Sequence, residues 1–127
     1  MNLEKVVFAF FILLALTLNF GFVMGEIDNP DHHNRYELFS ALIVSLIATV
    51  LKFGDRTHIG AVLLATSLVA DLQLLAAVGV WGYATYVAEL GVDGRIMADI
   101  VALSGGALVA NVCSVVLLII ETVMMRR

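Results

Sequence analysis

The chain has 127 residues, of which 61% are apolar and only 14% are charged. Soluble domains contain about 45–50% apolar and about 25% charged residues, so this composition excludes an ordinary soluble domain and predicts an integral membrane protein. Seven Lys and Arg residues against eleven Asp and Glu residues exclude a basic surface for nucleic acid. We therefore expect the lipid bilayer, and no nucleic acid, as a partner.

Four stretches are apolar and long enough to be membrane-spanning helices, which need about 20 residues. We expect these spans at residues 6–24, 36–53, 59–82 and 96–125. The second is the shortest, and we expect Lys52 to snorkel from its end to the membrane interface. Short loops make successive helices antiparallel neighbours. The predicted fold is all-α: one integral membrane domain over residues 1–127, with four transmembrane helices in an antiparallel bundle.

The first span has a second interpretation, a cleaved signal peptide, because Val23 and Gly25 are small enough to precede a cleavage site. Two features oppose it. Glu4 stands beside Lys5, and the apolar stretch exceeds the about 7–15 residues usual in signal peptides. We expect the first helix to be retained.

Lys and Arg residues are unevenly distributed between the two sides of the predicted bundle. One side carries Lys5, Lys52, Arg56, Arg126 and Arg127, and the other carries Arg35 and Arg95. This bias predicts that both termini and the turn at residues 54–58 are cytoplasmic. Trp81, Tyr83 and Tyr86 then lie at the outer interface, where aromatic rings are favoured. The small size and short loops favour the inner membrane of a bacterium.

Asp71 carries most of the functional prediction. It lies twelve residues past Ile59, about 18 Å along the helix and near the middle of a hydrocarbon core about 30 Å thick. An ionised side chain there costs at least about 2.5 kcal/mol, so it must face protein or water, or be protonated. It either handles an ion or a proton, or fixes the register of two helices through hydrogen bonds, and the sequence favours neither.

Further polar residues complete the predicted ion pathway. Ser67 shares the helix face of Asp71, whereas Gln73 lies on the opposite face. Ser104 shares the face of Asn111, which reaches nearly the depth of Asp71 in an antiparallel pair of helices. We predict a direct hydrogen bond between Asp71 and Asn111, within one chain or between chains. The simpler interpretation of Asn111, a residue that holds membrane helices together, is favoured.

Small residues predict close contacts between helices. Gly21 and Gly25 form a GxxxG pair, and Gly106 and Ala110 belong to a ladder of small residues four positions apart. Asn19, in the first span, is interpreted as a helix-packing residue.

The loop at residues 25–35 combines carboxylates and imidazoles, which suit divalent cations. Its candidate metal ligands are Asp28, Asp31, His32 and His33. Adjacent histidines in a flexible loop have no fixed ligand geometry, so a solvated acidic loop that concentrates cations is favoured over a metal site.

No catalytic or nucleotide-binding motif is recognisable, and the one cysteine, Cys113, has no histidine near it in the sequence. We expect neither enzymatic activity nor a cofactor. The favoured function is a channel or ion-coupled transporter for a cation or proton, acting as a homo-oligomer with Asp71 on a shared axis. The alternative is a non-transporting accessory subunit or scaffold that binds a cytoplasmic or membrane partner protein.

Overall fold

The computed structural model describes residues 3–25, 29–55, 57–89 and 91–125, without the side chains of His32 and Met125. Its long helices are α1 (Leu3–Val23), α2 (Arg35–Lys52), α3 (His58–Gly82) and α4 (Gly94–Met125). A short 3-10 helix, η1 (Pro30–His32), precedes α2, and a π-helical turn, η2 (Tyr83–Val87), continues α3. Every long helix begins and ends within three residues of a predicted span. The all-α prediction is confirmed, and no strand occurs among the residues described.

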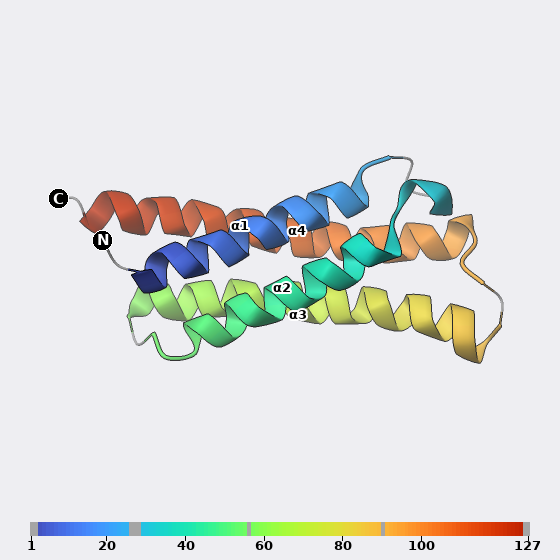
Figure 1. Cartoon of the computed structure of the whole chain (residues 1–127), viewed down its shortest axis with the longest axis horizontal. Coiled ribbons are helices and arrows are strands. Elements are labelled where there is room, and N and C mark those ends of the chain that lie inside the picture. Colours follow the sequence, from blue (N-terminus) through green and yellow to red (C-terminus); the bar gives the residue numbers. More distant parts are fainter. Residues whose placement is uncertain (1–2, 26–28, 56, 90, 126–127) are drawn as a thin grey trace.

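The four helices lie side by side as a ring of antiparallel neighbours (Figure 1). α1 contacts α2 and α4, and α3 also contacts α2 and α4. The start of α1, the turn between α2 and α3 and the end of α4 lie together, at what we call the Lys52 end (Figure 1). The opposite end, with η1 and η2, is called the His33 end. A side chain on the inner face of any helix therefore meets the interior of the ring.

Local sequence explains where the helices begin and end. Asn34 caps α2, because its side chain accepts from the Tyr36 amide (2.8 Å), and Thr57 caps α3 in the same way. The Asp93 carboxylate accepts from the Ile96 amide (2.9 Å) at the start of α4. α1 ends just before Gly25, whose φ of 102° suits glycine and turns the chain away.

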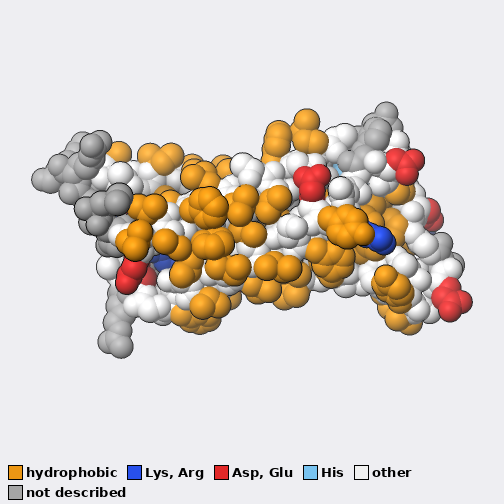
Figure 2. Space-filling model, in the orientation of Figure 1, with side chains coloured by type: hydrophobic (Ala, Val, Ile, Leu, Met, Phe, Trp, Pro, Cys, Tyr) orange, Lys and Arg blue, Asp and Glu red, His pale blue; other side chains and the backbone are white. Residues whose placement is uncertain are grey.

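Three helical segments are long and apolar enough to cross a membrane: α1, α3 with η2, and α4. Their length and composition are those of a membrane protein. α2 has 18 residues and carries charges in its first and last turns, at Glu37 and Lys52. Apolar side chains cover much of the face seen in Figure 2, and most charged side chains lie toward its ends, with one acidic side chain close to the middle. Large exposed side chains such as Leu72 (70%) and Val50 (68%) suit lipid contact.

The buried core contains two apolar clusters. The smaller one, toward the Lys52 end, consists of Phe8, Ile12, Ala48 and Leu63. The larger one includes Phe22, Leu38, Leu74, Met97 and Ile100. Each long helix also buries at least one polar side chain in the interior. The bundle is thus apolar outside and partly polar inside.

Two of the small residues predicted at helix contacts lie against side chains of a neighbouring helix. A Cβ added to Gly21 would meet the Glu37 carboxylate, and one added to Gly106 would lie 2.9 Å from the amide of Gln73. Ala110 is buried as well. Gly25 lies beyond the end of α1, so the predicted GxxxG pair does not form one helix face.

Candidate functional site

Asp71 projects from α3 toward α2 and is 5% exposed. Ser45 Oγ donates to Asp71 Oδ1 (2.7 Å), and Thr49 Oγ1 lies 2.5 Å from Asp71 Oδ2. Ser45 and Thr49 are four residues apart on α2, so one helix face presents both hydroxyls. Asp71 is the fourteenth residue of α3, about 20 Å from its start. We call Ser45, Thr49 and Asp71 the Asp71 site.

The predicted hydrogen bond between Asp71 and Asn111 within one chain is wrong. Asp71 is bonded to α2, and the Asn111 side chain on α4 has no hydrogen-bond partner among the described residues. α3 lies between α2 and α4 in the ring, and its face toward α4 carries Thr66, whose hydroxyl bonds Ser114. Asp71 therefore points away from the helix that was expected to bind it.

The sequence-based interpretation also missed Ser45 and Thr49. Two hydroxyls spaced i, i+4 in an apolar span are a visible signal, because they lie on one helix face. Asp71 is buried within one chain and faces α2, whereas the expected position on an axis shared between subunits stays a prediction.

Four other polar side chains are fully buried and have no hydrogen-bond partner in the part of the chain that the structure describes. They are Asn19 on α1, Ser67 on α3, and Ser104 and Asn111 on α4. A buried polar group left without a partner costs about 1–3 kcal/mol. Polar groups in such a position are the usual binding sites of internal water, which makes about 2–4 hydrogen bonds. These side chains thus make the interior suitable for water.

The bond between Thr66 Oγ1 and Ser114 Oγ (2.5 Å) fixes the register of α3 against α4. A helix rises about 1.5 Å per residue. Along the helix axis, counted from this bond toward the His33 end, Ser67 therefore lies at about 1.5 Å, Asn111 at about 4.5 Å and Asp71 at about 7.5 Å. All three occupy one layer about 6 Å thick. Asn111 is thus near Asp71 in depth, as predicted, although the two side chains do not bond.

A second register comes from the ion pair between Lys5 Nζ and Glu121 Oε1 (2.6 Å), which joins α1 to α4. Asn19 lies about 21 Å from Lys5 along α1, and Ser104 about 25 Å from Glu121 along α4. These two residues therefore form a second polar level, closer to the His33 end. The interior carries polar groups at successive depths.

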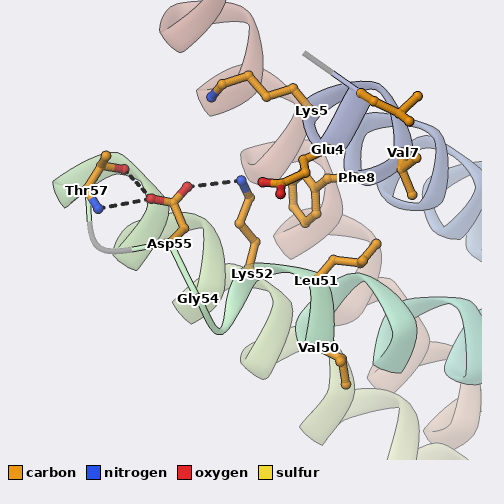
Figure 3. A pocket seen from close by; sticks show the side chains of 11 residues that line it. Glu4, Lys5, Val7, Phe8, Val50, Leu51, Lys52, Gly54, Asp55 and Thr57 are labelled. Carbon is orange, nitrogen blue, oxygen red and sulfur yellow. Dashed lines mark hydrogen bonds and ion pairs between the residues drawn. The ribbon is translucent and has the colours of Figure 1, made fainter.

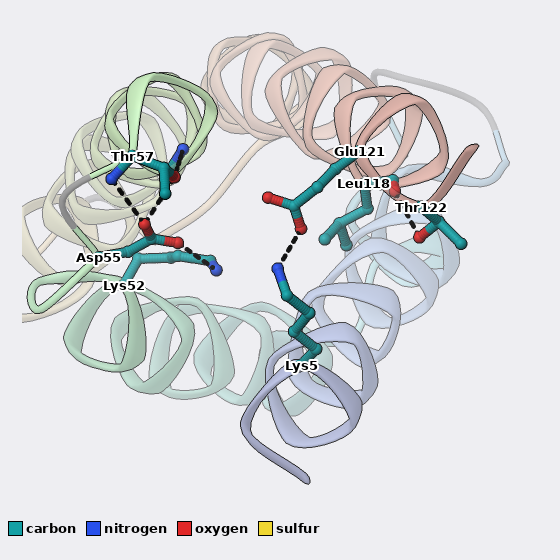
Figure 4. A network of polar contacts seen from close by, with 8 residues as sticks. Lys5, Lys52, Asp55, Thr57, Leu118, Glu121 and Thr122 are labelled. Atoms are coloured by element: carbon teal, nitrogen blue, oxygen red, sulfur yellow. Dashed lines mark hydrogen bonds and ion pairs between the residues drawn. The ribbon is translucent and has the colours of Figure 1, made fainter. Parts of the chain in front are cut away.

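The Lys52 end holds two ion pairs, drawn in Figure 4: Lys5 with Glu121, and Lys52 Nζ with Asp55 Oδ2 (3.2 Å). Lys52 Nζ also lies 4.3 Å from the centroid of the Phe8 ring. Lys5, Phe8, Lys52 and Asp55 border a cavity of about 830 Å³ between α1 and the end of α2 (Figure 3). Asp71 does not line it.

Asp55 is held by Thr57 as well as by Lys52. The Thr57 hydroxyl (2.7 Å) and amide (2.9 Å) both donate to Asp55 Oδ1. These bonds, helped by Lys52, lower the pKa of Asp55 from 3.8 to about 2. The turn between α2 and α3 is therefore fixed by its own side chains.

The predicted metal ligands are not brought together among the described residues. His33 is buried, and its Nδ1 donates to the Phe22 carbonyl oxygen (2.5 Å). Asp31 is exposed. Asp28 and the His32 side chain lie outside the described residues. Across the described ranges there is no group of three or more residues that could hold a metal ion.

Comparison with known proteins yields one family match. Residues 32–122 match the model of DUF6394, described as a family of unknown function. The matched region contains α2, α3, most of α4 and the entire Asp71 site. No curated protein and no solved structure matches the chain.

Proposed function

We propose that this chain, which belongs to the DUF6394 family of unknown function, conducts a proton or another cation across a membrane through its polar interior. In this proposal all four helices span the membrane, and the Lys52 end with both termini faces the cytoplasm of a bacterial inner membrane. Asp71 binds the ion halfway along the path. We expect no enzymatic activity.

The observation that carries the proposal is a buried carboxyl group surrounded by polar side chains that lack protein partners. Ionisable residues in membrane helices are rare and costly, and they mark ion or proton pathways. Asn111 and Ser67 lie in the same layer as Asp71, and Asn19 and Ser104 continue the polar interior toward the His33 end. Water bound to these groups would connect Asp71 toward the His33 end of the bundle.

Titratable groups near the two ends extend this path. His33 is buried at one end, and Glu121, which is 7% exposed, pairs with Lys5 at the other. Chains of His, Asp and Glu side chains are the usual carriers in membrane proton relays. The path lies within one chain, so a homo-oligomer would hold one path in each subunit instead of a shared axis.

Ion flux in liposomes tests the proposal. Purified chain is reconstituted with a pH-sensitive dye inside, and a membrane potential is imposed. We expect proton flux in the native chain, at least a tenfold loss in Asp71→Asn, and no loss in the matched control Asp31→Asn, which changes an exposed aspartate. Equal flux in Asp71→Asn and the native chain would remove Asp71 from the pathway.

A second candidate function is a non-transporting subunit of a larger membrane complex. It is favoured by the close bonding of Asp71 to α2 and by the cavity at the Lys52 end, which Asp71 does not line. In that case Asp71 only joins α2 to α3. The native chain would then show no flux, and Asp71→Asn would change stability or assembly alone.

A further inference from the structure

We infer that Asp71 carries a proton in this structure, and that the ion bound at the Asp71 site is a proton and not a metal cation. The inference deepens the proposed function by naming the ion. The protonation of Asp71 stands on hydrogen-bond geometry, and only its use in transport rests on the proposed function.

The argument begins with the single hydroxyl proton of Thr49. Thr49 Oγ1 lies 2.9 Å from the Ser45 carbonyl oxygen and 2.5 Å from Asp71 Oδ2. A hydroxyl group has one donor and two acceptor positions. If Asp71 were ionised, the Ser45 carbonyl oxygen and Asp71 Oδ2 could both only accept. The one hydroxyl proton of Thr49 would then satisfy just one of these two short contacts.

A proton on Asp71 Oδ2 resolves this conflict. Asp71 then donates to Thr49 Oγ1, Thr49 donates to the Ser45 carbonyl oxygen, and Ser45 Oγ donates to Asp71 Oδ1. Each of the three protons is used once, and each of the three short distances joins a donor to an acceptor. The closed set of hydrogen bonds also explains how a carboxyl group is accommodated where only 5% of the residue is exposed.

Charge around the site supports the same state. The ionisable groups on α2 lie at its two ends: Arg35, Tyr36, Glu37 and Lys52. Those on α4 are Arg95, Asp99, Cys113 and Glu121, and η2 contributes Tyr83 and Tyr86 at the end of α3. Among the described ion pairs, both lysines bind other carboxylates, Glu121 and Asp55. Arg35, His58 and Arg95 lie in the first turns of their helices, and neither ion pair of the described residues involves Asp71. Burial of a carboxylate without a cation is strongly unfavourable.

The geometry also argues against a metal cation. A bound cation needs several oxygen lone pairs that converge on one point, usually six or more for Ca²⁺ and Mg²⁺. At the Asp71 site, the Ser45 hydroxyl proton lies between Ser45 Oγ and Asp71 Oδ1. The oxygen atoms of the site are therefore joined to one another by hydrogen bonds and do not converge on one point.

Release of the proton follows from the same contacts. The proton leaves Asp71 Oδ2 for a water molecule, and the Thr49 hydroxyl rotates from the Ser45 carbonyl to Oδ2. The resulting carboxylate still accepts two hydrogen bonds, from Ser45 and Thr49. Thr49 is thus a positioning residue that stabilises both charge states.

Infrared spectroscopy of the full chain in lipid bilayers tests the inference without measuring transport. A protonated carboxyl group has a C=O stretching band that a carboxylate lacks. At neutral pH we expect this band in the native chain, its loss in Asp71→Asn, and its retention in the control Asp31→Asn. Ser45→Ala should keep the band but shift it to higher frequency, because the C=O group then loses its donor.

Absence of the band in the folded native chain at neutral pH would overturn the inference. If Asp71→Asn does not fold, ¹³C-aspartate labelling of the native chain identifies the band by its isotope shift, and Ser45→Ala assigns it to Asp71. A Ser45→Ala spectrum with an unshifted band would contradict the assigned hydrogen bonds. A protonated Asp71 without proton flux would refute the proposed function alone, whereas flux with an ionised Asp71 would refute this inference alone.

Discussion

Thr49→Val is the most informative single substitution, because valine keeps the shape of threonine and removes only the hydroxyl group. Thr49 Oγ1 contacts both Asp71 Oδ2 and the Ser45 carbonyl, and the side chain is 4% exposed. Without the Thr49 hydroxyl, the Asp71 carboxyl group keeps Ser45 as its only partner. A buried polar group left unpaired costs about 1–3 kcal/mol, whereas hydrogen bonds between membrane helices contribute about 0.6 kcal/mol on average. We expect a loss of about 1–2 kcal/mol in unfolding free energy.

The assay is reversible unfolding in detergent, followed by helical circular dichroism, within a double-mutant cycle. In the Asp71→Leu background, Thr49→Val should cost less than about 0.5 kcal/mol, because its partner is gone. Thr17→Val is the matched control: Thr17 is exposed and bonds only within its own helix, to Leu14. Additive effects of the Thr49 and Asp71 substitutions would refute the contact between α2 and α3.

Three further predictions concern the ends and the interior of the bundle. Lys5→Met leaves the largely buried Glu121 without its cation and should lower the unfolding free energy by about 1–2 kcal/mol; an unchanged value would contradict the ion pair. Asp55, with its pKa lowered from 3.8 to about 2, stabilises the fold above pH 3.8 and loses that effect as pH falls through 2. Asp55 should thus account for roughly 1 kcal/mol of the unfolding free energy that the native chain loses over that window, so Asp55→Asn should lose that much less. Equal losses in the two chains would refute the assignment. Asn111→Leu should reduce proton flux severalfold by removing a polar group beside Asp71, and full flux would exclude Asn111 from the path.

The helices were predictable because lipid leaves few choices for the chain. A segment in hydrocarbon must satisfy its backbone internally, so long apolar stretches bounded by charges become helices with well-defined ends. The end of α3 was less predictable. The predicted third span ends at residue 82, but Tyr83–Val87 continues the helix as a π-helical turn, with the Ala88 amide bonded to the Tyr83 carbonyl.

The partner of Asp71 was not predictable in the same way. Helical periodicity identifies which residues share a face, but it does not reveal which neighbouring helix that face contacts. The rotation of α3 is set by packing of the whole ring, which turns Asp71 toward Ser45 and Thr49 and leaves Asn111 without a protein partner. The depth of Asp71 could be derived by counting residues, whereas its hydrogen bonds required the three-dimensional arrangement.

Hydrogen–deuterium exchange of the Asp71 carboxyl proton tests most directly whether this buried acid communicates with solvent. The native chain in bilayers is transferred into D₂O, and the isotope shift of its C=O band is followed over time beside the exchange of backbone amides. We predict that the Asp71 proton exchanges well before the amides in the middle of α3, while the protein stays folded. Exchange no faster than those amides would show that Asp71 opens only when the helices separate, and would contradict a proton path through the bundle.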